Sequence, residues 1–202
     1  MSRPGLRPKV CVVTGSRADY GLLEPVMRLF QEDPAFQLQV VATGAHCSPE
    51  HGDSLREIET DGFALDARIE MLLACDTASG VAKSMGLATI GFADAFARLV
   101  PDLVMVLGDR YEILAAAQAA LVARIPLAHL CGGDLTEGAF DDAIRHALTK
   151  LAALHFTTNA ASAARVRQLG EDPARIFNVG SPGIDRLQRL RPLSREALAA
   201  DL

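Results

Sequence analysis

Short apolar runs alternate along this chain with longer segments of helical periodicity, and this alternation restricts the fold more than any other feature. The run at 103–107, LVMVL, is continuously apolar, as a central strand of a parallel sheet is. Further strands are expected at 10–14, 38–43, 63–69, 125–130, 155–158 and 176–179, and helices at 20–31, 57–59, 78–99, 113–122, 144–154 and 160–169. Because parallel strands need crossover helices, the sequence predicts an α/β fold with a doubly wound parallel sheet of the Rossmann-like type.

Composition excludes several classes of protein. The 202 residues can bury one substantial core, and the formal net charge of −5 argues against a nucleic-acid footprint spread over the surface. The longest apolar stretch, 113–131, carries Gln118, Arg124, Pro126 and His129, which argues against a membrane span. The 4 cysteines form no C-x-x-C pair. We therefore expect a cytoplasmic protein with reduced thiols, no metal site, no membrane partner and no nucleic-acid partner.

The chain is expected to divide into three parts. Residues 1–9, basic and proline-containing, are expected to form a disordered tail. Residues 10–180 are expected to form the Rossmann-like domain. The GSPG motif at 180–183 is typical of a linker, so residues 181–202 are expected to be a linker and the start of a second domain, with helical composition at 184–190 and 194–202.

An acidic loop, HLCGGDLTEGAFDDAIRH at 129–146, connects the end of an expected strand to the start of a helix. Groups that can move or steer a proton gather in it: His129, Asp134, Glu137, Asp141 and Asp142. Ligands of open α/β sheets bind beyond the carboxyl ends of the strands, where this loop would lie. The alternative is that Asp141 caps a helix and Asp142 decorates its first turn.

A second acidic group follows the central strand. Asp109 and Arg110 come directly after the run at 103–107, so they are expected at the same sheet edge as the acidic loop. The alternative is that Asp109 caps the helix at 113–122 with Arg110 as its ion partner.

The loop GSRADYG at 15–21 has no G-x-G-x-x-G pattern, so a dinucleotide fingerprint is absent. Arg17 would lie beside backbone N–H groups at a helix entrance, which suits a phosphate. A capping loop with a solvated arginine is the alternative, and the two stay open.

Four segments together resemble the hydrolysing UDP-N-acetylglucosamine 2-epimerases of the sialic-acid and legionaminic-acid pathways. They are TGSRADYG at 14–21, TGAH at 43–46, VLGDRYE at 106–112 and the segment 129–158, and NVGSPGID at 178–185 resembles the family's crossing into its second domain. The resemblance implies a GT-B-type fold of two domains, of which this chain is the N-terminal half. It also implies a UDP-sugar substrate, no cofactor, a homo-oligomer in the full-length form, and a missing half that supplies a catalytic histidine.

In such an enzyme, UDP is eliminated to give a 2-acetamidoglycal, and hydration then yields N-acetylmannosamine. The chemistry needs a base at carbon 2, an acid or electrostatic group at the leaving oxygen, and a group that directs water. The resemblance assigns catalysis to Asp109 and Asp141, with Asp134 as the third acid and Glu137 as its possible substitute. It assigns substrate binding to these cationic or titratable residues: Arg17, His46, Arg110, His129, Arg145 and His146.

Alternatives remain for the substrate and for the class of protein. The same chemistry on UDP-N,N′-diacetylbacillosamine fits the TEGAFDD pattern at 136–142 equally well. A non-catalytic sugar-nucleotide binding module is a second alternative, because half of the cleft is absent. An NAD-dependent oxidoreductase fits the fold but lacks the glycine fingerprint. Cys131 ends an apolar run, and we interpret it as a small hydrophobic residue because elimination requires no nucleophile.

Overall fold

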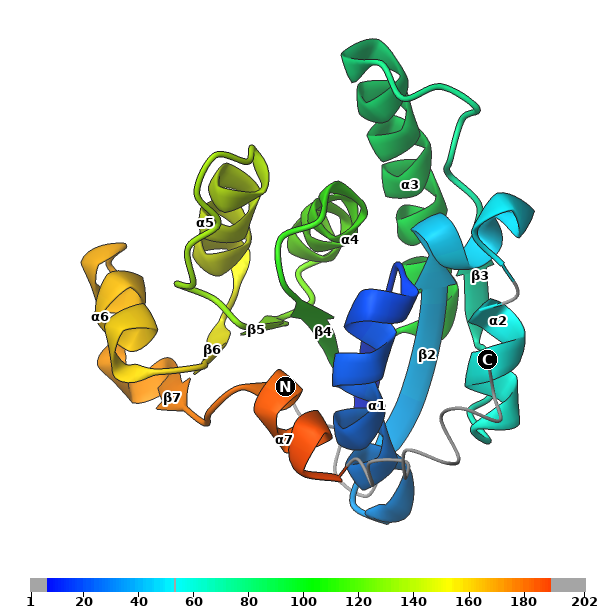
Figure 1. Ribbon diagram of the computed structural model, residues 1–202. Helices are drawn as coiled ribbons and strands as arrows, with labels where there is room; N and C mark the ends of the chain where they lie inside the picture. Colours follow the sequence, from blue (N-terminus) through cyan, green and yellow to red (C-terminus); the bar gives the residue numbers. More distant parts are fainter. Residues whose placement is uncertain (1–6, 53, 190–202) are drawn as a thin grey trace, which may run out of the picture.

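The chain folds into one parallel sheet of seven strands, with helices on both faces (Figure 1). The computed structural model describes residues 7–52 and 54–189. The sheet order is β3-β2-β1-β4-β5-β6-β7, and every adjacent pair is parallel. The strands are β1 (Lys9–Thr14), β2 (Gln37–Thr43), β3 (Ala67–Ile69), β4 (Leu103–Leu107), β5 (Leu127–Leu130), β6 (Leu154–Thr157) and β7 (Ile176–Asn178). The prediction of a doubly wound parallel sheet is confirmed.

The helices follow the strands as the sequence predicts. They are α1 (Arg17–Glu32), α2 (Ser54–Thr60), α3 (Ala78–Leu99), α4 (Tyr111–Val122), α5 (Asp141–Leu151), α6 (Ala160–Gln168) and α7 (Pro182–Arg189), with short 3₁₀ turns at Gly44–Cys47, Pro49–His51 and Pro173–Arg175. Strand order reverses between β1 and β4, so the chain winds outward in both directions from this point. In such folds the crevice at the reversal is the usual ligand site.

Two hydrophobic cores lie on opposite faces of the sheet, because successive side chains of a strand point to opposite sides. Val10 and Val12 of β1 pack on one face with residues of α1 and α2. Cys11 and Val13 pack on the other face with residues of α3, α4 and α5. The central strands are buried on both faces, which explains why their sequences are continuously apolar.

The third strand is shorter than its alternating pattern predicts. Strand β3 begins at Ala67 instead of Phe63. Phe63 is buried with its ring edge-on to Tyr20, at 6.5 Å between centroids, so its hydrophobicity reflects packing on α1 rather than strand pairing. Asp66 then ties the chain to β2 by accepting a hydrogen bond from the Val40 N–H at 2.8 Å.

Both ends of the expected domain differ in detail. Lys9 is the first residue of β1 and not part of a tail, because its N–H donates to Asp102 at 2.8 Å. Helix α7 begins at Pro182, two residues after Gly180, and packs beside α1 (Figure 1). The helix expected at 184–190 therefore starts two residues earlier, inside the segment interpreted as a linker. Residues 1–6 and the helix expected at 194–202 lie outside the described residues.

Within the described part of the chain, no helix combines the length and hydrophobicity that a bilayer crossing requires.

Candidate active site

The loops after β1, β2, β4 and β5 meet at the carboxyl edge of the sheet. Glycines with positive φ open two of these loops, Gly44 at 57° after β2 and Gly108 at 81° after β4. Only glycine adopts such angles without steric cost, so the chain can turn sharply where each strand ends. Asp109 and Gly15 consequently lie on either side of the point where the strand order reverses.

Asp109 and Arg145 form the central contact of this edge. Arg145, whose side chain is 11% exposed, makes an ion pair with Asp109 Oδ2 and donates to the Cys131 carbonyl oxygen at 3.1 Å. Thr136 Oγ1 donates to the same Asp109 oxygen at 3.1 Å and accepts from Arg145 at 2.8 Å. The alternative that Asp109 caps α4 is wrong, because Arg110 occupies the N-cap position.

Asp134 approaches the same cluster from the loop after β5. Its Oδ2 lies 3.9 Å from Arg145 Nη1, and its Oδ1 accepts hydrogen bonds from Thr158 at 2.5 Å and Ser162 at 2.6 Å. Two hydroxyl donors and one guanidinium therefore hold the Asp134 carboxylate in place. The structure thus brings three predicted residues together: Asp109, Asp134 and Arg145. Sequence spacing carries no signal for the two hydroxyl residues that hold Asp134.

The remaining loop acids are spread around the cluster. Glu137 is exposed, and Asp141 is the half-buried first residue of α5. Asp141 is not the helix cap, because Phe140 occupies that position without a side-chain hydrogen bond. Asp142 instead accepts from the Thr136 N–H at 3.0 Å and lies 3.5 Å from His146 Nε2, so it shapes the loop that carries Thr136. The catalytic assignments of Glu137 and Asp141, and the substrate contact of His146, stay predictions.

His129 is wholly buried beneath the cluster. Its Nε2 lies 2.7 Å from the Gly108 carbonyl oxygen, and its Nδ1 lies 3.2 Å from Thr149 Oγ1. Because a carbonyl oxygen only accepts, Nε2 carries the proton. Burial lowers the pKa of His129 to about 4, so the ring is neutral near pH 7. In this position it fixes the backbone immediately before Asp109, and its assignment to substrate binding stays a prediction.

His46 is also buried, with 2% of its surface exposed. Its Nδ1 lies 2.8 Å from Ser54 Oγ, its Nε2 lies 3.0 Å from Thr14 Oγ1, and its ring is edge-on to Tyr20. Burial lowers its pKa from the ordinary value. These contacts hold His46 between the end of β1 and the start of α2, and its direct contact with a substrate stays a prediction.

Two backbone N–H groups at the entrance to α1 are already used. Asp19 accepts from the Gly15 N–H at 2.8 Å and from the Ser16 N–H at 2.6 Å. This acceptor explains why α1 begins at Arg17, three residues before the apolar periodicity. These two N–H groups are therefore not free to bind an anion at this loop.

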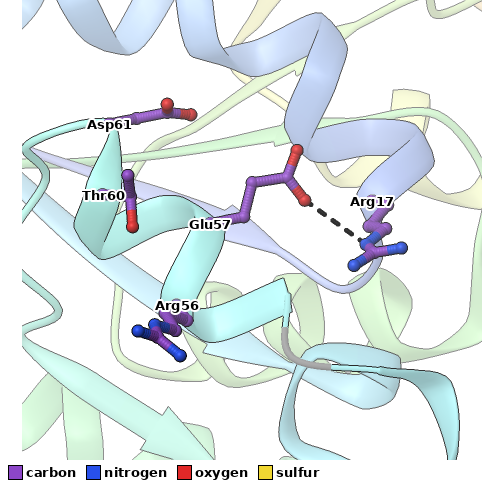
Figure 2. Close-up of a pocket in the computed structure, with 5 residues that line it drawn as sticks. All are labelled: Arg17, Arg56, Glu57, Thr60 and Asp61. Atoms are coloured by element: carbon purple, nitrogen blue, oxygen red, sulfur yellow. Dashed lines mark ion pairs between the residues drawn. The ribbon is translucent and has the colours of Figure 1, made fainter. Parts of the chain in front are cut away.

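Arg17 points toward α2 in this structure. Figure 2 shows its guanidinium directed at Glu57, with Nε 3.3 Å from Oε2, in an open pocket of about 530 Å³. The pocket is lined by Arg17, Arg56, Glu57, Thr60 and Asp61. Both partners of the ion pair are well exposed, at 62% and 45%, so the pair contributes little stability and can be exchanged for a ligand. The phosphate role of Arg17 stays a prediction.

Arg110 and Glu112 form a further ion pair of the site, and sequence analysis missed Glu112. Its side chain is 0% exposed, and Oε1 accepts from Arg110 Nε, whereas the Arg110 side chain is 45% exposed. Burial raises the pKa of Glu112 from its ordinary value. An added Cβ at Gly15 would lie 2.7 Å from Glu112 Cγ, and one at Gly44 would lie 3.2 Å from its Oε1. A glutamate within the first turn of an alanine-rich helix gives no sequence signal for such burial.

Cys131 matches the interpretation as a small hydrophobic residue. It packs against an apolar core, and burial raises its pKa to about 11, so the thiolate is scarce near neutral pH. Its φ of 63° is unusual for a residue other than glycine and directs its carbonyl oxygen to Arg145. Among the residues that the structure describes, no group of three or more histidine, cysteine, aspartate or glutamate side chains is arranged to hold a metal ion.

Sequence comparison relates this chain to the 2-epimerases of UDP-sugars. A family model described as UDP-N-acetylglucosamine 2-epimerase matches residues 28–202. The GDP/UDP-N,N′-diacetylbacillosamine 2-epimerase (hydrolyzing) of Campylobacter jejuni is 44% identical over 94% of this chain, and the UDP-N,N′-diacetylbacillosamine 2-epimerase (hydrolyzing) of Legionella pneumophila is 38% identical over 93%. This chain spans 49% and 50% of those two proteins, or about half of each.

A solved structure shares the fold. The UDP-N-acetylglucosamine 2-epimerase of Methanocaldococcus jannaschii, in complex with UDP-N-acetylglucosamine and UDP, superimposes with a TM-score of 0.79 at 22% identity. The match covers 90% of this chain and 49% of that one.

The buried state of His129 predicts a loss of stability in acid. Its pKa of about 4 lies below the ordinary 6.5, so unfolded chains bind a proton more readily between these values. The stability that neutral His129 contributes is present above about pH 6.5 and is lost as the pH falls toward 4, up to roughly 3 kcal/mol. Urea unfolding of wild type and His129→Asn at several pH values should show a shallower acid slope in the variant. The buried His46 and His155 retain the rest of the slope, because their pKa values are lowered too.

The control for this measurement is Leu148→Ala, which removes a fully buried side chain on α5 without removing a titratable group. It should lower stability equally at all pH values. A slope in His129→Asn equal to that of wild type would contradict the burial argument.

The contact between Gly15 and Glu112 predicts a rescue experiment. Gly15→Ala should destabilise the fold by roughly 1–3 kcal/mol, because the new Cβ collides with a buried carboxylate. In a Glu112→Ala background the colliding atoms are gone, so Gly15→Ala should cost much less. Gly86→Ala is the control, since its Cβ would meet nothing within 4 Å and should be neutral or slightly stabilising in the helix. Equal costs of Gly15→Ala in both backgrounds would refute the contact.

Proposed function

Because the chain belongs to the UDP-N-acetylglucosamine 2-epimerase family, we propose that it supplies the acid-bearing half of a hydrolysing 2-epimerase. The observation that carries the proposal is the cluster at the carboxyl edge of the sheet, where Arg145 links Asp109 to Asp134. Two carboxylates on one guanidinium, beside the reversal of strand order, suit proton transfer on a ligand bound in the crevice.

The reaction we propose is elimination of the nucleotide followed by hydration. A base takes the proton from carbon 2, the bond from carbon 1 to the phosphate oxygen breaks, and UDP leaves with a 2-acetamidoglycal. Water then adds across the double bond, with the new proton delivered to the opposite face of carbon 2. The products are the free sugar with inverted carbon 2 and UDP, so atoms balance without a redox step.

The residues of the cluster suit different steps of this reaction. Asp109 is partly exposed and is held by Arg145 and Thr136, so we assign it a proton-transfer role together with Asp141. Asp134 is fixed by two hydroxyls, so we assign it to holding Arg145 and to directing water. The resemblance to the family implies that its second domain supplies most nucleotide contacts.

For the substrate we propose a UDP-linked 2-acetamido sugar. The two reported relatives are named for UDP-N,N′-diacetylbacillosamine, which favours that sugar over UDP-N-acetylglucosamine. A cytoplasmic location and a homo-oligomer in the full-length form remain part of the proposal.

A non-catalytic sugar-nucleotide binding module is the second candidate. One observation favours it: Asp109 and Asp134 are both engaged by Arg145 and by hydroxyl groups, which suits a structural role for these acids. Binding of UDP without turnover would support it.

The first test is release of UDP and free sugar when the purified full-length protein is incubated with each UDP-sugar in parallel. We expect stoichiometric release of both products, faster with the diacetamido sugar. Preference for UDP-N-acetylglucosamine would overturn the substrate choice. Binding of UDP with no release from either sugar would replace catalysis by the binding module.

Asp109→Asn should lower turnover by at least about 10²-fold, because it keeps the size of the side chain but removes the acid or base. The ion pair with Arg145 is lost as well, so thermal midpoints must be measured beside UDP release to separate destabilisation from lost chemistry. Asp172→Asn is the control, since this aspartate only caps a surface 3₁₀ turn, and its turnover should stay at the wild-type level. Unchanged release of UDP by Asp109→Asn would make Asp109 a structural residue.

A further inference from the structure

Glu112 is the one glutamate in the described residues that is 0% exposed, and its burial has no explanation in packing alone. A buried carboxylate costs free energy unless it is paired, and an apolar residue of the same size would cost less. The hydrogen bonds of Glu112 offset this free-energy cost only in part. Oε1 accepts from Arg110 Nε, whereas Oε2 has no hydrogen-bond partner among the described residues.

The surroundings of Glu112 lie at the crevice. Its carboxylate packs against the backbone at Gly15 and Gly44, the first residues after β1 and β2. Gly44 in turn leaves no room for a side chain, since its Cβ would lie 2.8 Å from the Gly15 carbonyl oxygen. Glu112 therefore sits where three strand ends converge, directly beneath the loop that leads into α1.

The loop after β1 is flanked by buried negative charge, which is unusual for a site that would bind an anion. Asp19 is 5% exposed and occupies the Gly15 and Ser16 N–H groups, and Glu112 is a second buried carboxylate beside the same backbone. Two negative groups would repel a phosphate here. Arg110 is the cation bound to Glu112, and its 45% exposed side chain reaches from that contact toward solvent.

The mode of contact leaves Arg110 able to bind a ligand. Glu112 engages Nε, and within the described part of the chain the terminal guanidinium nitrogens make no recorded hydrogen bond. An arginine held at Nε presents its outer N–H groups in one orientation, and such a fixed fork recognises phosphate oxygens better than a mobile side chain does. Holding the side chain beforehand also avoids an entropy loss on binding.

We propose that Glu112 is a positioning residue, whose buried carboxylate fixes the Arg110 guanidinium at this edge of the sheet to receive the diphosphate of the nucleotide. The inference rests on the proposed function, because it takes the diphosphate as the anion. Glu112 itself touches no substrate and acts through Arg110.

A double-mutant cycle tests the proposal, with UDP as the probe. Glu112→Gln keeps the size of the side chain but removes its charge, so we expect UDP binding by calorimetry to weaken on the order of tenfold. KM for the UDP-sugar should rise by a similar factor, with a smaller change in kcat, because the substitution weakens binding of the nucleotide in the ground state. Arg110→Ala should weaken binding at least as much. In the Arg110→Ala background, Glu112→Gln should have no further effect.

The control is Glu24→Gln, which removes a glutamate paired with Arg28 on α1 and should leave UDP binding unchanged. If Glu112→Gln fails to fold, Glu112→Asp replaces it in the cycle, because it keeps the charge but shortens the reach to Arg110 by one methylene. Arg110→Lys tests the other end of the contact, because lysine keeps the charge but has no Nε to be held. It is expected to bind UDP on the order of tenfold more weakly.

The outcomes separate this inference from the proposed function. Additive losses in the cycle, or wild-type UDP affinity in Glu112→Gln or Arg110→Lys, would overturn the role of Glu112 while turnover by the wild type still supports the epimerase. Absence of both UDP binding and turnover in the wild type would overturn both.

Discussion

The arrangement of the site depends on the ion pair between Arg145 and Asp109. Arg145 comes from the first half of α5 and Asp109 from the loop after β4, so the pair joins two adjacent βα units. The guanidinium also reaches the Cys131 carbonyl oxygen and Thr136, which orders the loop between β5 and α5. Because the pair is largely shielded from water, removing either partner would leave a charge poorly compensated. The rigidity of this contact is what allows carboxylates from separate loops to face one crevice.

Two buried carboxylates, those of Asp19 and Glu112, stabilise the loop after β1 at the same edge of the sheet. Asp19 completes the start of α1 by taking the N–H groups of Gly15 and Ser16, and Glu112 fills the space beneath them. Glycine at 15 is then required by a side chain that lies nearly a hundred residues away in sequence. The same arrangement withdraws the Gly15 and Ser16 N–H groups from anion recognition, whereas phosphate loops leave such backbone N–H groups free.

Much of the fold could be predicted from local sequence patterns, and the predictions that were wrong have local causes. The continuous apolar run of β4 predicted a central strand, and burial on both faces confirms the reason. The alternation at 63–69 predicted too long a strand, because Phe63 is buried by packing on α1, which period-two spacing cannot distinguish from pairing. Asp109, Asp134 and Arg145 were predicted as site residues and do lie together. Thr136, Thr158 and Ser162, which hold them, were not predicted, since hydroxyl residues have no characteristic spacing.

The sequence by itself determined the element order, the parallel sheet and the edge at which the polar loops would gather, because these follow from hydrophobic periodicity and from the need for crossover helices. Only the tertiary structure decided which partners the charged groups take. Asp109 pairs with Arg145 rather than capping α4, Arg110 pairs with Glu112, and His129 is a neutral support beneath Gly108. Charge pairing depends on distance in space and on burial, and neither quantity is encoded in the local pattern of a strand or a helix.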